Sequence, residues 1–308
     1  MTAFSFSDDN KRYHTLHYYN KHAFGCRVYK AAIDAGLSCP NRDGRCGTGG
    51  CTFCSGGSGY FTRGALSVRE QYLAEEKRIR AKSPNALIQA YFQAGSNTYA
   101  DVETLARLYG QAIECGASSI SVATRADCLD RARAGLLAGL PVPVTVELGL
   151  QTVHDKTATR VNRCHSFEDF LCGYALLKEY GLRVCVHIIN GLPQETRDMM
   201  LQTADVLGRL RPDGVKIHLL HVIIGTPLAQ LYESGGYQPM NRKEYIDTVV
   251  AQLELLPPQT VIERLTGDGD KRTLLAPLWS ADKIAVLGGI DKRQRELDSW
   301  QGKRFTEG

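Results

Sequence analysis

The chain has 308 residues, of which 43% are hydrophobic and 23% charged, an ordinary globular composition that allows one large domain or two of average size. A formal net charge of +4 and a pI near 8.5 are compatible with a phosphate-bearing partner but exclude a strongly basic nucleic-acid tail. Ten cysteines in a chain of this length favour a reducing compartment over a disulfide scaffold. The amino terminus lacks a signal-peptide pattern, and no apolar run approaches the roughly 20 residues that cross a bilayer, so we expect a soluble cytoplasmic protein without membrane contact.

Short apolar runs rich in strand-forming residues alternate with helical patterns along most of the chain. The predicted strands are 28–33, 87–94, 119–123, 144–150, 184–189 and 215–221. Six such units predict an α/β fold, a partial (β/α)6 TIM-like barrel with parallel strands. We expect residues 1–25 to form an N-terminal cap, residues 26–236 to form the barrel and residues 237–308 to form a C-terminal extension packed on it.

The helices between these strands have recognisable starts and apolar faces. Ser67 and Glu70 have the spacing of a capping box. Apolar stripes at helical spacing follow in 102–113, 167–174 and 200–210. We expect these stripes to face the core.

The loop after the first strand carries Cys39, Cys51 and Cys54 in a C-x11-C-x2-C spacing, with several glycines between them that let the chain wrap around a compact group. Cysteine thiolates are the usual ligands of iron–sulfur clusters, one for each iron. Three ligands would leave one iron of a four-iron cluster open, which indicates chemistry. In the competing interpretation, Cys46 is a fourth ligand and the loop holds a structural zinc, although a zinc ribbon normally offers two close cysteine pairs.

The cysteine loop is one of several motifs along the chain, in the segments 37–44, 50–54, 123–128, 147–152, 191–193 and 273–279, and an aromatic residue, Phe53, precedes its last cysteine. These motifs, in this order, resemble those of the radical S-adenosylmethionine (radical SAM) superfamily. They resemble more closely the YhcC/YtqA-type subfamily, with a core like that of Elongator and coproporphyrinogen-oxidase members. The resemblance implies an oxygen-sensitive enzyme that reductively cleaves S-adenosylmethionine at one [4Fe-4S] cluster to a 5'-deoxyadenosyl radical.

The resemblance also implies roles for individual residues. The expected cluster ligands are Cys39, Cys51 and Cys54. The expected cofactor-binding residues are Phe53, Gly95, Ser96, Asn97, Arg125, Glu147, Gln151, Arg163, Ile189 and Gly191. The family's Gly-Gly-Glu-Pro-like stretch corresponds to 93–98, which lacks the glutamate, and Cys164 stands where a glycine is usual.

Two cysteines and two histidines are candidates for the catalytic residue. Cys128 and Cys164 lie in loops after predicted strands, while His218 and His221 lie on or just after the sixth strand. Strand alternation places Lys216 on the same face as His218. A packing role is the alternative for each of these side chains.

The substrate best suggested by the resemblance is a C5-modified wobble uridine (U34) in tRNA. The alternatives are a small or porphyrin-like metabolite treated by the same chemistry, and a non-catalytic zinc-stabilised RNA-binding protein. Basic and aromatic residues interleave over 11–22, a composition that either grips RNA or caps the barrel. A radical SAM enzyme also requires a low-potential electron donor such as flavodoxin or ferredoxin.

Overall fold

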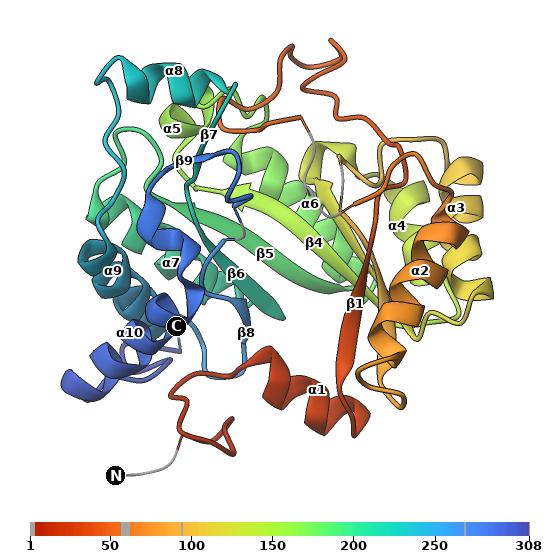
Figure 1. Cartoon of the computed structure of the whole chain (residues 1–308), viewed down its shortest axis with the longest axis horizontal. Helices are drawn as coiled ribbons and strands as arrows, with labels where there is room; N and C mark the ends of the chain where they lie inside the picture. Colours follow the sequence, from red (N-terminus) through yellow and green to blue (C-terminus); the bar gives the residue numbers. More distant parts are fainter. Residues whose placement is uncertain (1–3, 57–61, 94, 268, 308) are drawn as a thin grey trace.

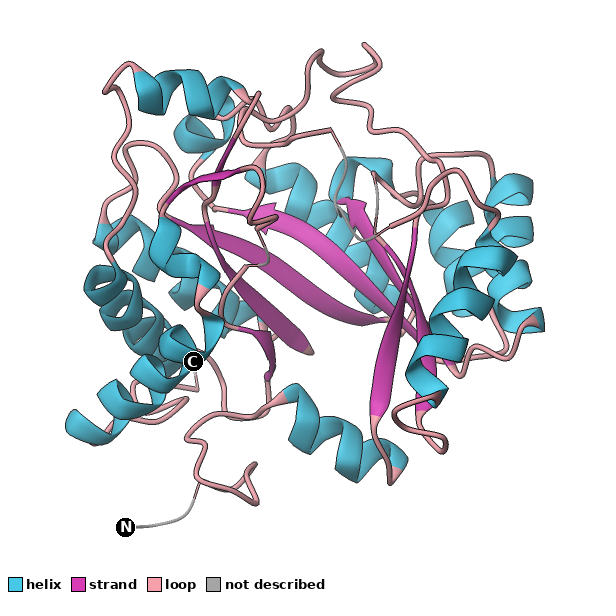
Figure 2. Cartoon of the chain, viewed as in Figure 1, coloured by secondary structure: helices cyan, strands magenta, loops and turns pink. Residues whose placement is uncertain are grey.

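The computed structural model describes residues 4–56, 62–93, 95–267 and 269–307. Seven strands form one parallel sheet in the order β1-β2-β3-β4-β5-β6-β8, and the sheet curls into a half-barrel (Figures 1 and 2). The strands are β1 Val28–Ile33, β2 Leu87–Phe92, β3 Ser119–Arg125, β4 Val144–Gln151, β5 Arg183–Asn190, β6 Gly214–Leu219 and β8 Val261–Arg264. A two-stranded antiparallel sheet pairs β7 Val222–Ile223 with β9 Leu274–Ala276. The predicted partial TIM-like barrel is therefore confirmed, with seven strands in place of six.

Most of the helices after β1 lie along the outer face of this sheet (Figure 2). The helices after β1 are α2 Val68–Arg80, α3 Val102–Glu114, α4 Arg131–Ala138, α5 Asp155–Arg160, α6 Phe167–Glu179, α7 Arg197–Leu210, α8 Pro227–Glu233, α9 Arg242–Leu255 and α10 Lys283–Glu296, with short 3-10 turns η1 Ala126–Cys128 and η2 Leu278–Ala281. Of these, α8 contacts β7 and α10 packs on α9. The predicted capping box is confirmed, since Ser67 Oγ accepts from the Glu70 amide and the Glu70 carboxylate accepts from the Ser67 amide at 2.8 Å. Two of the donors that a helix start leaves unpaired are thereby satisfied.

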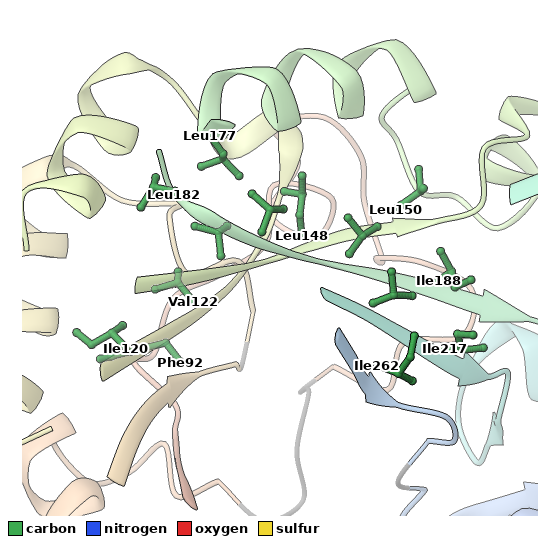
Figure 3. Close-up of a cluster of buried hydrophobic side chains, with 14 of the residues drawn as sticks. Phe92, Ile120, Val122, Leu148, Leu150, Leu177, Leu182, Ile188, Ile217 and Ile262 are labelled. Carbon is green, nitrogen blue, oxygen red and sulfur yellow. The ribbon is translucent and has the colours of Figure 1, made fainter. Parts of the chain in front are cut away.

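The two faces of the sheet have opposite polarity. Toward the helices, Phe92, Ile120, Leu148 and Ile188 are at most 1% exposed and pack in one cluster with Leu177 of α6 (Figure 3). Burial of each such side chain contributes about 1.5–3 kcal/mol to folding. Because successive side chains of a strand point to opposite faces, the alternate positions of the same strands are turned into the half-barrel. Those positions carry mainly polar residues, so the interior of the half-barrel is lined by polar side chains and is not a hydrophobic core.

The seventh strand, β8, comes from the segment that the sequence assigned to an extension. It pairs in parallel with β6, Val215 beside Ile262 and Lys216 beside Arg264, and the register shifts by one residue between these pairs. This irregularity brings two consecutive residues to the interior, where Glu263 binds Lys30 at 3.3 Å and Arg264 lines a cavity. The four-residue strand was missed because it is too short for an alternation pattern.

The N-terminal segment lies at the amino-end rim of the half-barrel. Helix α1, Leu16–Phe24, lies across the gap between β8 and β1 (Figure 1). Just before it, Thr15 bridges Ile262 in parallel and the His14 carbonyl accepts from the Ile262 amide at 2.7 Å. This placement supports the proposed cap, of which residues 1–3 lie outside the described residues. Of the helices in the described part of the chain, none is both long and apolar enough to span a membrane.

Candidate functional site

The cysteine loop lies between β1 and α2, above the carboxyl ends of the strands (Figure 1). Tight turns bring its cysteines back toward each other: the Arg42 amide donates to the Cys39 carbonyl at 2.8 Å, and the Cys54 amide donates to the Cys51 carbonyl at 2.9 Å. All ten cysteines of the chain are free thiols. Burial and, next in size, the neighbouring Cys54 raise the pKa of the Cys51 thiol to about 12.

A backbone contact from the next strand fixes the start of this loop. Gly95 has a φ of 70°, and a Cβ atom there would lie 2.2 Å from the Leu37 carbonyl oxygen. The adjacent Ser96 amide donates to the Ser38 carbonyl at 3.0 Å. Only glycine fits such a close approach in the left-handed region, so Gly95 positions the cysteine loop on the sheet.

Arg125 connects the cysteine loop to the loop after β4. Its Nη1 donates to the Arg163 carbonyl at 2.8 Å, and its Nη2 lies 2.7 Å from Asp127 and 3.7 Å from Cys46 Sγ. Cys46 Sγ also lies 3.9 Å from Asp127 Oδ2. The Arg125–Asp127 pair therefore contacts Cys46 of the cysteine loop and, through the Arg163 carbonyl, the loop after β4.

The cluster and zinc interpretations of the loop require different arrangements of its sulfurs. Within the described ranges, no three His, Cys, Asp or Glu side chains are gathered closely enough to hold a single metal ion. A structural zinc requires four ligands at about 2.0–2.3 Å from one centre, whereas each thiolate of a cluster binds a different iron. A cluster would take one thiolate for each iron, whereas zinc would need Cys39, Cys46, Cys51 and Cys54 around one centre.

A cavity of about 680 Å³ occupies the upper interior of the half-barrel. Five of the predicted site residues line it together: Phe53 from the cysteine loop, Gln151 from the end of β4, Ile189 from β5, His218 from β6, and His221. The carboxyl ends of parallel strands meet at one edge of a sheet, which is why loops so far apart in sequence share this wall.

A buried ionic network centred on Glu147 lies beneath the cavity. Glu147 Oε1 accepts from Lys30 Nζ at 2.8 Å and from Ser121 Oγ at 2.7 Å, while Oε2 pairs with Lys216 and lies 2.9 Å from His187 Nε2. Burial opposes ionisation of this carboxyl, but the ammonium groups of Lys216 and Lys30 outweigh it and hold the pKa of Glu147 well below its usual range.

The network continues to Glu263 of β8. Its carboxylate lies 3.3 Å from Lys30 Nζ and accepts from Arg183 at 2.8 Å; burial is again outweighed by nearby cations, which lower the pKa of Glu263 to about 2. Lys216 and His187 line the upper cavity, whereas Lys30, Glu263 and Arg183 line a second cavity of about 490 Å³ at the amino ends of the strands. The ionic network is therefore the floor of the upper cavity.

Two histidines face the cavity in the neutral form. The His218 ring lies 5.3 Å from that of His187, and burial together with the charges of its neighbours holds the pKa of His218 well below its usual value. Burial lowers the pKa of His221 to about 4. In the part of the chain that the structure describes, Nε2 of neither ring has a hydrogen-bond partner although both atoms are buried. Such orphaned polar atoms in a cavity wall are suited to a polar ligand.

Comparison with known proteins places this site in a family. A family model described as the radical SAM superfamily matches residues 43–207, and one described as the radical SAM C-terminal domain matches residues 212–296. The chain belongs to the radical SAM superfamily. The protein YtqA of Bacillus subtilis (strain 168) is 43% identical over 307 residues, covering 98% of this chain and 95% of that protein. Protein YhcC of Escherichia coli (strain K12) is 36% identical over 280 residues, 89% of each chain.

Two further likenesses are partial. The tRNA uridine(34) acetyltransferase of Methanocaldococcus jannaschii is 31% identical over 126 residues, which are 40% of this chain and 23% of that protein. The solved structure of Elp3 from Methanocaldococcus infernus superposes with a TM-score of 0.71 at 17% identity, covering 90% of this chain and 64% of that chain. The structural likeness concerns the fold.

As a radical SAM enzyme, the protein uses a [4Fe-4S] cluster and S-adenosylmethionine. Its cysteine loop fits the cluster, because N–H groups of Asn41 and Arg42 approach the sulfurs of Cys51 and Cys54, and such donors stabilise thiolate ligands. We retain Cys39, Cys51 and Cys54 as the proposed ligands.

Ser96 and Asn97, two of the expected cofactor-binding residues, tie the loop after β2 to β3. Ser96 Oγ lies 3.1 Å from Thr124 Oγ1, and both the backbone and side-chain nitrogens of Asn97 donate to the Ala123 carbonyl at 3.0 Å. These bonds fix the loop above the carboxyl end of the sheet. Their direct contact with the cofactor stays a prediction.

Arg163 stabilises the backbone of the loop after β4. It is 1% exposed, and its guanidinium donates to the carbonyls of Leu150, Thr152 (2.8 Å) and His165 (3.0 Å). These bonds hold the turn that follows Gln151, whose φ is 61°, and a contact of Arg163 with the cofactor stays a prediction. The carboxylate of Glu147 takes part in the ionic network described above, and its contact with the cofactor likewise stays a prediction.

The two candidate cysteines lie away from the cavity wall. Cys128 is 8% exposed, and burial raises the pKa of its thiol to about 11. Cys164 has a φ of 59°, which explains why glycine is usual there, and its Sγ lies 3.2 Å from Asn162 Oδ1. Among the four catalytic candidates, the structure therefore brings only His218 and His221 to the cavity.

The remaining predicted residue, Gly191, has a φ of 85°. Its carbonyl accepts from the Tyr237 hydroxyl at 2.7 Å, which ties the segment after α8 to the end of β5. Sequence reasoning missed Lys30, Tyr91, His187 and Arg264 as interior residues. For the first three a signal was present, because strand alternation places them on the same face as the residues recognised on neighbouring strands.

Proposed function

We propose that this radical SAM enzyme modifies a C5-substituted wobble uridine (U34) in tRNA. The observation that carries the proposal is the similarity, over 40% of the chain, to a protein whose name specifies tRNA uridine(34) as its substrate. The mildly basic charge of +4 is compatible with RNA.

We assign the following roles to residues of the chain. Cys39, Cys51 and Cys54 hold the cluster, which when bound supplies the electron that cleaves S-adenosylmethionine to a 5'-deoxyadenosyl radical. Phe53 and Ile189 pack in one apolar cluster at the cavity wall and provide a surface for the adenine. The protein's contribution is position and the exclusion of water from a reactive intermediate.

The cavity suits one extruded nucleobase. Its volume of about 680 Å³ is in the range of small-ligand sites, and its wall offers the neutral rings of His218 and His221 together with Tyr91. Single bases are recognised by aromatic stacking and by hydrogen bonds to their edges. The same volume accommodates a small metabolite, which is the alternative under the same chemistry. Both alternatives require a cytoplasmic low-potential donor such as flavodoxin or ferredoxin.

Two measurements test the proposal in sequence. Anaerobically reconstituted enzyme with dithionite and S-adenosylmethionine is expected to release 5'-deoxyadenosine and methionine, and Cys54→Ala is expected to abolish this. Mass spectrometry of tRNA nucleosides from a deletion strain should then show an altered wobble uridine, restored by the wild-type gene but not by Cys54→Ala. Cofactor cleavage with an unchanged wobble-uridine profile would contradict the RNA substrate and favour the metabolite.

A further inference from the structure

Two consecutive residues of the cysteine loop, Asn41 and Arg42, reach the two sulfurs of its Cys-x2-Cys pair. Asn41 is completely buried; its Nδ2 lies 3.7 Å from Cys51 Sγ and also donates to the Asn162 carbonyl. Arg42 Nη1 lies 4.0 Å from Cys54 Sγ. One short stretch of chain thus presents an N–H donor to each sulfur.

The glycines of the loop make room for these two side chains. A Cβ atom on Gly47 would lie 2.3 Å from Asn41 Oδ1, and one on Gly50 would lie 3.2 Å from Arg42 Cγ. At Gly56, past the last cysteine, a Cβ atom would lie 3.1 Å from Arg42 Nη2. The Arg42 side chain therefore runs along the loop from Gly50 to Gly56 and passes Cys54 on the way. These glycines accommodate particular neighbours in addition to providing backbone freedom.

We propose that Asn41 and Arg42 set the reduction potential of the cluster by hydrogen bonding to the sulfurs of Cys51 and Cys54. Reduction adds one electron, from the low-potential donor, to a cluster held by thiolates. N–H donors and a nearby guanidinium charge stabilise the more negative reduced state and raise the potential. The proposal rests on the ligand assignment of Cys51 and Cys54 and is independent of the identity of the substrate.

The decisive experiment compares Arg42→Gln with Arg45→Gln in anaerobically purified holoenzyme. Both variants remove one exposed guanidinium from the same loop, but that of Arg45 lies over the Tyr99 ring at 5.4 Å. Cluster midpoint potentials are measured by redox titration monitored by electron paramagnetic resonance, with iron and sulfide counted per chain. We expect a lower potential for Arg42→Gln and a potential close to that of the wild type for Arg45→Gln.

Equal potentials in the wild type and an iron-replete Arg42→Gln would overturn the proposal, as would an equal shift in both variants, which would indicate only the loss of a surface charge. Asn41→Ser provides a second, independent variant at Cys51 if Arg42→Gln binds less iron. A potential like that of the wild type in Asn41→Ser with its cluster intact would likewise refute the role. A purely structural function would lower the iron content without moving the potential of the clusters that remain.

Discussion

Replacement of Glu147 by glutamine tests whether the ionic floor stabilises the half-barrel. The Glu147 side chain is completely buried and the Lys216 side chain is 4% exposed, so Glu147→Gln leaves a buried ammonium without its carboxylate. Lys30 is affected less, because it keeps Glu263 at 3.3 Å and is 27% exposed. Breaking a buried pair on one side costs about 3–5 kcal/mol. At about 2 °C per kcal/mol for a chain of this size, Tm should fall by about 6–10 °C.

The control is the same chemical change in a surface pair. Glu76 binds Arg80 at 2.7 Å across one turn of α2, and such pairs contribute at most about 1 kcal/mol. Thermal unfolding of both anaerobic variants, followed by circular dichroism, should show a shift below about 2 °C for Glu76→Gln. Equal shifts in the two variants would refute the reasoning.

The pH dependence of the same variant has a defined sign. Because the pKa of Glu147 is depressed in the folded state, its stabilising effect is present above the unfolded pKa, near 4.5, and is lost as the pH falls below that value. The stability difference between wild type and Glu147→Gln should therefore shrink on acidification.

Three further outcomes are expected. Gly95→Ala should lower the iron bound per chain, because its Cβ would overlap the Leu37 carbonyl; iron content equal to that of the wild type would show that the loop adapts. Cys46→Ala should keep about four irons per chain and Cys54→Ala should lose them, whereas the loss of metal in both would revive the four-cysteine zinc site. Burial lowers the pKa of His221 from 6.5 to about 4, so its contribution to stability is present above pH 6.5 and is lost as the pH falls toward 4. In His221→Gln the free energy of unfolding should therefore vary less with pH between 4 and 6.5. An unchanged pH dependence would contradict the burial of a neutral ring.

Much of the fold is recoverable from local sequence because its elements are locally specified. The first six strands are apolar runs bounded by turns. The start of α2 is specified by the capping box of Ser67 and Glu70, three residues apart. The cysteine loop is equally local, since Cys39, Cys51 and Cys54 lie within sixteen positions of each other. These features depend on neighbours in the chain, which a sequence displays directly.

The contacts between polar residues inside the half-barrel could be identified only from the tertiary structure. The carboxylate of Glu147 is paired with Lys30 and Lys216, which lie 117 and 69 positions away in the chain. The guanidinium of Arg163 donates to the carbonyls of Leu150 and Thr152. Which partner a buried charge finds depends on strand order and register, since a shift of one residue, as at β8, changes the face to which a side chain points. The sequence by itself therefore determined the cluster loop and the alternation of strands and helices, while the folded sheet decided which polar residues meet inside it.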